Sequence, residues 1–325
     1  MPMHADRRAP GVSAVADFSG RYGTALFFIT LIVLNAFITP NFVSLGTVAN
    51  TLVQVFPVML VALGMTMVIS SGGIDISVGA IMAVATAVAA RLYTSDMGFI
   101  PQLGLFPAIC CGLVAGGLCG LFNGLLVAKF RIQPIIVTLV TMIAGRALAH
   151  IILDKLTTSL SNTPFGELGK LKPGGVPIQI VMMTVVVAVM VFVARKTNFA
   201  KRVEAVGDNP RAARLVGINT VSVLIGVYIL CGVLCAVAGM MEAARSNIVN
   251  VGILGKLVEL DAIAAVAIGG TAFSGGRARI MGTVFGAIVV QLVTIIVNMN
   301  NIDFHYSLIL KAIILIIAVW TQRKT

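Results

Sequence analysis

The feature that most constrains this chain is its long apolar runs, which contain too few polar groups for a water-soluble fold. One example is VMMTVVVAVMVFVA, residues 181–194, which has no polar face at either helical or strand spacing. A helix of about 20 apolar residues crosses the ~30 Å hydrocarbon layer of a bilayer. A strand of a membrane β-barrel would instead alternate polar and apolar residues. The sequence therefore predicts an all-α protein that crosses the membrane several times.

Polar or glycine-rich segments divide the apolar sequence into ten runs. We expect a polytopic bundle of about ten spans, at residues 24–38, 50–71, 77–92, 105–128, 132–153, 176–194, 222–243, 258–273, 280–297 and 305–321. Residues 1–23 form a polar tail. No small-residue cleavage site follows residue 38, so we interpret the first run as a retained span and not as a signal peptide. Residues 24–325 are then a single membrane domain.

The basic residues predict how this bundle is oriented. Charged residues make up only 11% of the chain, against about 25% in an average globular protein. Most of the 23 lysine and arginine residues fall in alternate loops or at the termini. Cytoplasmic loops of membrane proteins are enriched in these residues, so we expect both termini to be cytoplasmic. This topology accounts for the net charge of +11, and a nucleic-acid partner is not expected.

No pattern in the sequence predicts catalysis, a bound metal or a bound nucleotide. The five cysteines lie within apolar runs, and no Cys or His spacing is typical of a metal site. Neither the GxxxxGK[ST] phosphate loop nor the GxGxxG fingerprint occurs. We therefore expect no catalytic residue in this chain and no cofactor bound by it.

The longest loop on the expected cytoplasmic side, residues 195–221, contains the stretch VEAVGDNPRAARLVGI. Asn209 or Asp208 can cap a helix, Pro210 suits its first turn, and Gly217 suits its C-terminal end. A helix of about two turns is not stable alone in water, so it must pack on something else. The residues leave two partners open: the lipid headgroup surface or a groove on a cytoplasmic protein.

Polar residues at the start of the third span are candidates for a solute path. Asp75 and Ser77 lie in SGGIDISVG, residues 71–79, between two apolar runs. Irregular backbone at membrane depth is tolerated where it is buried in protein or lines a wet cavity. Two interpretations are open. The pair lines a path for solute, or it caps the helix that follows.

Arg146 lies past the middle of the fifth span, where a charge is costly and a functional role is the default hypothesis. At helical spacing it shares a face with Thr138, Met142, His150 and Asp154. Either this polar stripe lines an aqueous path, or Arg146 turns toward the outer surface and pairs with Asp154.

Small residues repeat in the fourth span at intervals of four: Gly112, Gly116, Gly120 and Gly124. Such a ladder favours close helix packing or a subunit interface over a solute path. Asn123 beside it is the polar exception and is a further path candidate. Glycine breaks at 72–79 and 269–276 do not fall at equivalent places, so the sequence does not support an internal repeat.

Four motifs resemble those of membrane permeases from ATP-binding-cassette importers of the ribose type, within the branched-chain amino acid/ribose permease superfamily that includes galactofuranose permeases. They occur in the family's order and cover most of the chain from about residue 50. Ala147 departs from the glycine that we expect after Arg146. The motifs are SGGIDISVG, QPIIVTLVTMIAGR, EAVGDNPRAARLVGI and ELDAIAAVAIGGTAFSGG.

The resemblance implies that the short helix in loop 195–221 docks into a cleft of the ATPase subunit. The positions that match the family's coupling motif are Glu204, Ala205, Gly207, Asn209, Ala212, Ala213 and Gly217. Together with the polar candidates for the substrate pathway, which are Asp75, Ser77, Asn123, Thr138, Met142 and Arg146, they form the predicted site.

The resemblance further implies a multi-pass permease of the bacterial inner membrane that imports a pentose or a hexose. Its expected partners are a cytoplasmic ATPase that holds ATP and Mg²⁺, a periplasmic sugar-binding protein and a second permease subunit, identical or not. The alternatives are a gradient-driven secondary transporter or channel for a small polar solute, and an importer permease for a nucleoside.

Overall fold

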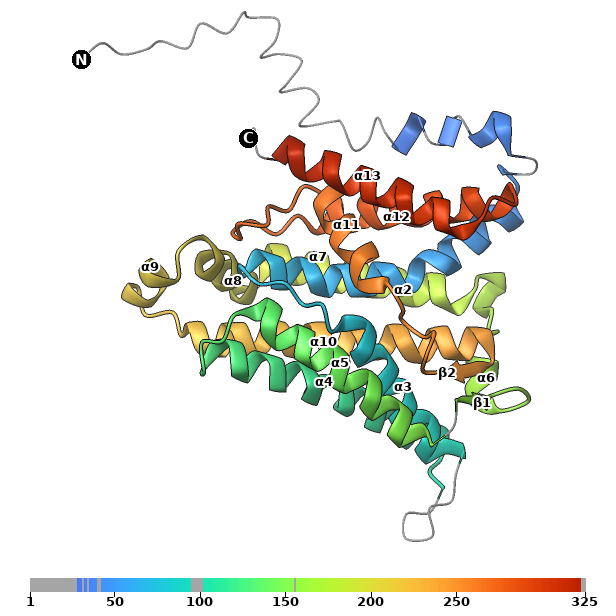
Figure 1. Ribbon diagram of the computed structural model, residues 1–325, viewed down its shortest axis with the longest axis horizontal. Coiled ribbons are helices and arrows are strands. Elements are labelled where there is room, and N and C mark those ends of the chain that lie inside the picture. Colours follow the sequence, from blue (N-terminus) through green and yellow to red (C-terminus); the bar gives the residue numbers. More distant parts are fainter. Residues whose placement is uncertain are drawn as a thin grey trace, which may run out of the picture.

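The computed structural model describes residues 28–30, 32–33, 35–39, 42–94, 102–154 and 156–322. These residues form a helical bundle, which agrees with the predicted all-α fold. The bundle carries one small two-stranded sheet (Figure 1). The expected first span, 24–38, lies partly outside the described residues, and the polar tail 1–23 lies wholly outside them.

Nine helices correspond to the second to tenth expected spans. They are α2 (Leu45–Ser70), α3 (Val78–Thr94), α4 (Leu105–Ala128), α5 (Pro134–Leu153), α7 (Ile178–Lys196), α10 (Thr220–Ser246), α11 (Val258–Ile268), α12 (Ile280–Met299) and α13 (Phe304–Gln322). Within the described part of the chain, six of them are long and apolar enough to cross a membrane, namely α2, α4, α5, α7, α10 and α12. The expected span 258–273 is too long, because Gly270 takes a positive φ of 80° just after α11 ends.

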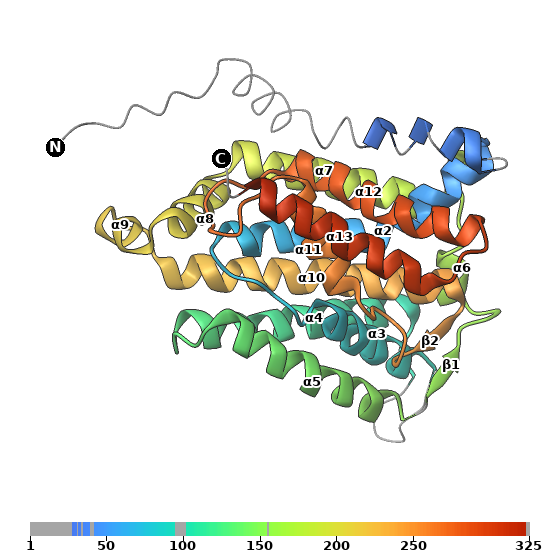
Figure 2. The same ribbon diagram turned by 45° about the horizontal axis from the view of Figure 1, so that its top comes forward.

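The two ends of the bundle carry different small elements. At one end β1 (Thr157–Ser159) pairs antiparallel with β2 (Ile248–Asn250), beside α6 (Pro164–Leu168) and the 3-10 helix η1 (Pro173–Gly175). We call this the strand end. At the opposite end lie α8 (Asn198–Asp208) and α9 (Pro210–Leu215), and we call it the α9 end (Figures 1 and 2).

Two helices, α3 and α11, begin in the middle of the bundle (Figure 1). α2 runs to the α9 end, and the chain then returns to the middle, where α3 starts and runs to the strand end. α10 and α11 repeat this course in the opposite direction. The starts of these two helices are in contact, because a Cβ at Gly79 in α3 would overlap the carbonyl oxygen of Gly255, three residues before α11. Such inverted, interrupted helices are common in transporters.

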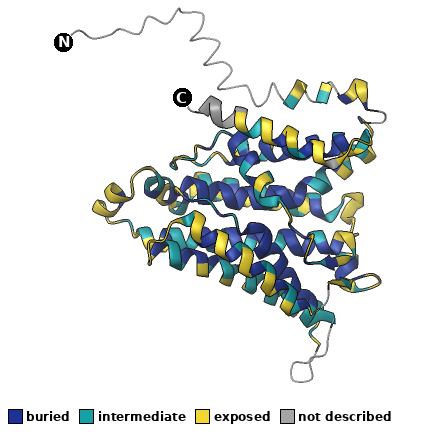
Figure 3. Ribbon diagram, viewed as in Figure 1, coloured by how far each residue is buried: buried dark blue, intermediate teal, exposed yellow. Residues whose placement is uncertain are grey.

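The packing of the bundle is centred on α2 and α10, while α5 and α13 expose many positions (Figure 3). The glycine ladder of α4 faces α10, which confirms its predicted packing role. The residues that meet the four glycines are Met240 of α10 with Ala85 and Ala89 of α3 at Gly112, Gly232 and Ala236 at Gly116, Tyr228 and Ile229 at Gly120, and Ile225 and Tyr228 at Gly124. Exposed apolar residues on α5 and α7, such as Ile143 and Val185, suit contact with lipid or with another subunit.

Candidate functional site

The helix α9 begins as its sequence predicts. The side-chain oxygen of Asn209 accepts hydrogen bonds from the backbone N–H groups of Arg211 and Ala212, both at 3.0 Å. Pro210 occupies the first helical position, where its missing N–H costs nothing. Of the two cap residues that the sequence left open, Asn209 is therefore the one that caps α9.

The end of α9 is also the predicted one. Gly217 has a φ of 83°, and its N–H donates to the carbonyl of Arg214, while the N–H of Ile218 donates to that of Ala213. This pair of hydrogen bonds defines a Schellman motif, which needs a left-handed residue at its centre. The short helix in loop 195–221 is thus confirmed.

The tip of the molecule at α9 exposes two large apolar side chains beside two arginines, Arg211 and Arg214. The side chain of Ala213 is buried, whereas Leu215 is 89% exposed and Val216 is 77% exposed. α9 lies beyond the ends of the long helices in both ribbon views (Figures 1 and 2). Two large apolar side chains at such a position form a small surface suited to a protein groove.

The sequence did not predict α8, which precedes α9. α8 buries Ala200, Val203 and Val206 at helical spacing against the rest of the bundle, and this three-residue period is the signal that could have revealed it. Glu204, Ala205 and Gly207, which the family resemblance placed with the docking residues, lie on α8. Only four of the seven matching positions therefore lie on α9 or at its ends.

α8 connects two distant parts of the bundle. The Glu204 carboxylate accepts a hydrogen bond from the backbone N–H of Ala278 at 2.9 Å. The N–H of Gly276 donates to the Ser70 carbonyl, also at 2.9 Å, and Gly207 lies so close to this bond that a Cβ would overlap the Ser70 oxygen. We call these five residues the α8 joint. The joint holds the end of α2 and the segment before α12 against α8.

Three of the predicted path residues form one hydrogen-bonded chain. The Ser77 hydroxyl donates to Asp75 at 2.5 Å, the Asn123 amide donates to Ser77 at 2.8 Å, and the Thr141 hydroxyl donates to Asn123 at 2.6 Å. All four side chains are buried. Thr141, which the sequence did not single out, extends the chain to α5. The polar groups thus link α3, α4 and α5 inside the bundle.

Asp75 forms a turn at the residue before α3, and its interpretation as a helix cap stays a prediction. Its carboxylate accepts the backbone N–H of Ser77 at 2.9 Å, immediately before α3. The second carboxylate oxygen and the hydroxyl of Tyr228 are buried and have no hydrogen-bond partner among the described residues. A role of Asp75 and Ser77 in solute passage stays a prediction.

Arg146 joins α5 to the segment before α11. Its guanidinium donates to the carbonyls of Val251 at 3.1 Å, Leu254 and Gly255 at 2.9 Å. We call this contact the Arg146 clamp. The alternative pairing with Asp154 is wrong, because Asp154 lies 3.9 Å from Arg91.

Thr138 and Met142 lie on α5 one turn apart. The Thr138 hydroxyl donates to the Pro134 carbonyl at 3.0 Å and lies 3.4 Å from the Ile74 carbonyl. Met142 is half-buried. The structure thus places Thr138 beside the segment that carries Asp75, and the pathway role of both residues stays a prediction.

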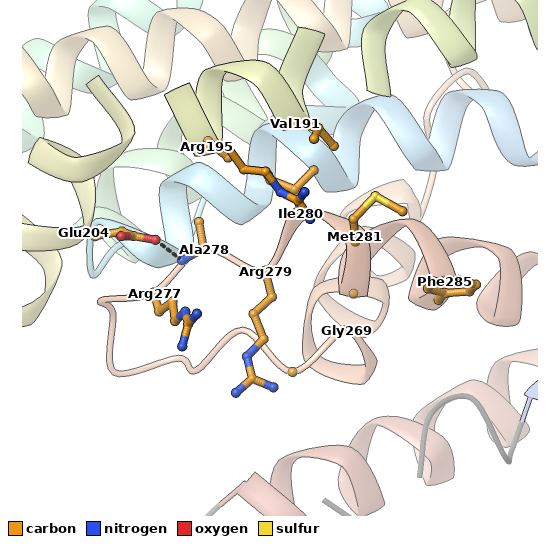
Figure 4. A pocket seen from close by; sticks show the side chains of 13 residues that line it. Val191, Arg195, Glu204, Gly269, Arg277, Ala278, Arg279, Ile280, Met281 and Phe285 are labelled. Carbon is orange, nitrogen blue, oxygen red and sulfur yellow. Dashed lines mark hydrogen bonds between the residues drawn. The ribbon is translucent and has the colours of Figure 1, made fainter. Parts of the chain in front are cut away.

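A cavity of about 760 Å³ opens at the α9 end, between α7, α8, α12 and the segment 269–279 (Figure 4). Three arginines line it, Arg195, Arg277 and Arg279, together with Glu204. Among the described residues, no cluster of three or more His, Cys, Asp or Glu side chains is placed to hold a metal ion.

The chain is similar to known membrane transport proteins. The family described as branched-chain amino acid transport system permease component matches residues 47–319. The ribose import permease protein of Bacillus subtilis is 36% identical over 306 residues, which cover 94% of this chain and 93% of that protein. The galactofuranose transporter permease protein of Escherichia coli is 33% identical over 86% of this chain and 80% of its own.

The fructose import permease protein of Rhizobium meliloti is also 33% identical, over 90% of this chain and 81% of that protein. No solved structure matches the chain.

Proposed function

Because this chain belongs to the family of branched-chain amino acid transport system permease components, we propose that it is the membrane-spanning subunit of an ATP-driven sugar importer. This membership agrees with the resemblance seen in its four motifs. The relatives are named for ribose, galactofuranose and fructose, so the substrate is a pentose or a hexose. This subunit catalyses nothing, and ATP and Mg²⁺ bind to a separate cytoplasmic ATPase.

The α9 end faces the cytoplasm of a bacterial inner membrane. Basic residues are concentrated at this end, in the loop between α4 and α5, at the end of α7, along α8 and α9, and before α12. The positive-inside rule places an end of this kind in the cytoplasm. The residues are Lys129, Arg131, Arg195, Lys196, Lys201, Arg202, Arg211, Arg214, Arg277 and Arg279. The strand end then faces the periplasm, where a sugar-binding protein delivers the substrate, and both termini are cytoplasmic.

The observation that carries this proposal is the exposed tip of α9. The helix lies beyond the spanning helices, which favours a cytoplasmic protein over the lipid surface as its partner. Leu215 and Val216 enter a groove of the ATPase subunit, and the caps at Asn209 and Gly217 preserve the helix that presents them. A docked partner supplies the packing that a six-residue helix lacks.

The α8 joint connects the docked helix α9 to the spanning helices. When ATP closes the two ATPase subunits under a pair of permeases, α9 moves with them. Glu204 and Gly207 pass the movement to the segment before α12 and to the end of α2. The predicted path residues, from Asp75 to Arg146, lie on or beside helices α3 to α5, and α3 and α4 pack on α10, which in turn packs on α2. The result is alternating access around a central path.

A matched pair of glycine variants tests the proposal. Gly217→Val places a β-branched residue at a φ of 83° and should disrupt the end of α9, so that the ATPase no longer copurifies although the permease still inserts. Gly174→Val is the control, because Gly174 has a φ of 61° at the strand end and open space around it. Unaltered copurification and transport in Gly217→Val would sink the docking role.

Uptake into proteoliposomes distinguishes the alternatives. The wild-type complex with its binding protein should import a labelled pentose or hexose only when ATP is supplied on the side of the membrane that carries the ATPase. Uptake that persists without ATP hydrolysis would favour a gradient-driven transporter. Uptake of a nucleoside and of no sugar would move the chain to the nucleoside class.

A further inference from the structure

The cavity at the α9 end has an excess of positive charge. Arg195 comes from α7, and Arg277 and Arg279 come from the segment before α12 (Figure 4). None of the three has an ion-pair partner among the residues that the structure describes. Glu204, the acidic residue in the lining, already accepts the Ala278 N–H. The cavity therefore offers three cationic side chains to an anion from outside the chain.

One wall of the same cavity is apolar and continues along the spanning helices. Val191 lies one turn before Arg195 on α7, and Met281 and Phe285 lie on the first turns of α12. Met281 is 42% exposed and Phe285 is 44% exposed. At 1.5 Å per residue, Phe285 is about 9 Å deeper than Arg279, the residue that precedes α12. The basic rim thus gives way to an apolar wall in the direction of the membrane.

We propose that this cavity binds an anionic phospholipid of the inner leaflet, with its phosphate on Arg277 and Arg279 and an acyl chain on Met281 and Phe285. Basic pockets between spanning helices on the cytoplasmic side bind anionic headgroups. A soluble anion would use the rim and leave the wall exposed. A cytoplasmic protein would reach the rim but would not follow the wall into the hydrocarbon layer.

Native mass spectrometry of the purified permease, without the ATPase, tests this site independently of the transport proposal. Added palmitoyl-oleoyl phosphatidylglycerol should bind, and the phosphatidylcholine with the same chains should bind more weakly. The double variant Arg277→Gln/Arg279→Gln should bind the phosphatidylglycerol about 30-fold more weakly, roughly 5-fold for each arginine. The control Lys201→Gln/Arg202→Gln removes two exposed charges of α8 at the same end and should stay within about 2-fold of wild type.

Three results would overturn the proposal. The first is equal phosphatidylglycerol binding by wild type and the Arg277/Arg279 double variant. The second is displacement of the lipid by inorganic phosphate at equal concentration, which would make the site a soluble-anion site. The third is an equal loss of phosphatidylglycerol binding in the Lys201→Gln/Arg202→Gln control, which would assign the effect to the general positive charge of the α9 end.

Discussion

Replacing Gly207 with alanine separates the two steps that a coupling element performs, docking and transmission. Gly207 lies on α8, away from the exposed tip, and contacts the end of α2. A Cβ at this position would overlap the Ser70 carbonyl oxygen and would lie 2.9 Å from its carbon and 2.7 Å from the Gly276 nitrogen. The overlap with the Ser70 oxygen is the closest of the three, and carbon and oxygen atoms normally stay about 3.3 Å apart, so α8 must retreat by roughly 1.5 Å.

Overpacking of this size costs about 1–3 kcal/mol. The retreat loosens the α8 joint, where the Gly276 N–H and the Ser70 oxygen are 2.9 Å apart. We expect Gly207→Ala to keep the affinity for the ATPase, because α9 and its caps are unchanged. Uptake should fall about 5-fold to 150-fold, the range that 1–3 kcal/mol of lost coupling gives.

The assay measures ATPase affinity and uptake on the same purified variant in proteoliposomes. Gly46→Ala is the matched control, since a Cβ there meets nothing within 4 Å, and it should behave like wild type in both measurements. Normal uptake with Gly207→Ala would refute the transmission role of the joint. Loss of ATPase affinity in parallel with uptake would show instead that Gly207 serves docking.

Three further predictions concern other contacts. Asn209→Ala removes the cap of α9 and should weaken ATPase affinity by about 0.5–2 kcal/mol, whereas Asn209→Asp should keep it; equal affinities in a binding titration would contradict the cap's importance. Arg146→Leu should reduce uptake more than assembly, because three carbonyls lose their donor. Arg146→Lys should keep part of the uptake, since lysine retains the charge without the planar guanidinium. Normal transport kinetics in both variants would reject a role of the Arg146 clamp in transport. Lys311→Met leaves Asp261, which it contacts at 2.8 Å, as an unpaired buried charge and should destabilise the protein by about 3–5 kcal/mol. Thermal unfolding in detergent should show recovery when Asp261→Leu is added, and its absence would count against the pair.

The sequence predicts α9 well because everything that delimits it is local. Asn209, Pro210 and Gly217 act on neighbouring backbone groups, so their types and spacing are sufficient. The ladder on α4 is predictable for a similar reason, since a repeat of four places all its glycines on one face.

The contacts of the α8 joint and of Arg146 are not predictable in this way. Glu204 and Ala278 are 74 residues apart, and Arg146 meets carbonyls more than 100 residues away. Because the partner in each contact is a backbone group, the Ala278 N–H for Glu204 and carbonyls for Arg146, the partner residues carry no identifying side chain. Charge and helical spacing alone suggested an ion pair between Arg146 and Asp154, but Asp154 lies near Arg91 instead.

The inverted course of the chain was missed because its two breaks use different chemistry. The break before α3 is marked by Gly72 and Gly73. The break before α11 lies at residues 247–257, where the Arg146 clamp satisfies the backbone carbonyls. The glycine pairs near residues 269–276 mark a turn at the α9 end and are not the counterpart of the first break.

The exposed tip of α9 also has a consequence for the life of the subunit before assembly. In the proposed complex, Leu215 and Val216 are uncovered until the ATPase binds, on a helix too short to be stable without a partner. Segments of this kind open locally and are preferred sites of proteolysis. A permease made in excess of its ATPase should therefore be cleaved in this segment and removed, while co-production of the two subunits protects it. The element that makes transport depend on a partner would then also keep the cellular amounts of the two subunits in balance.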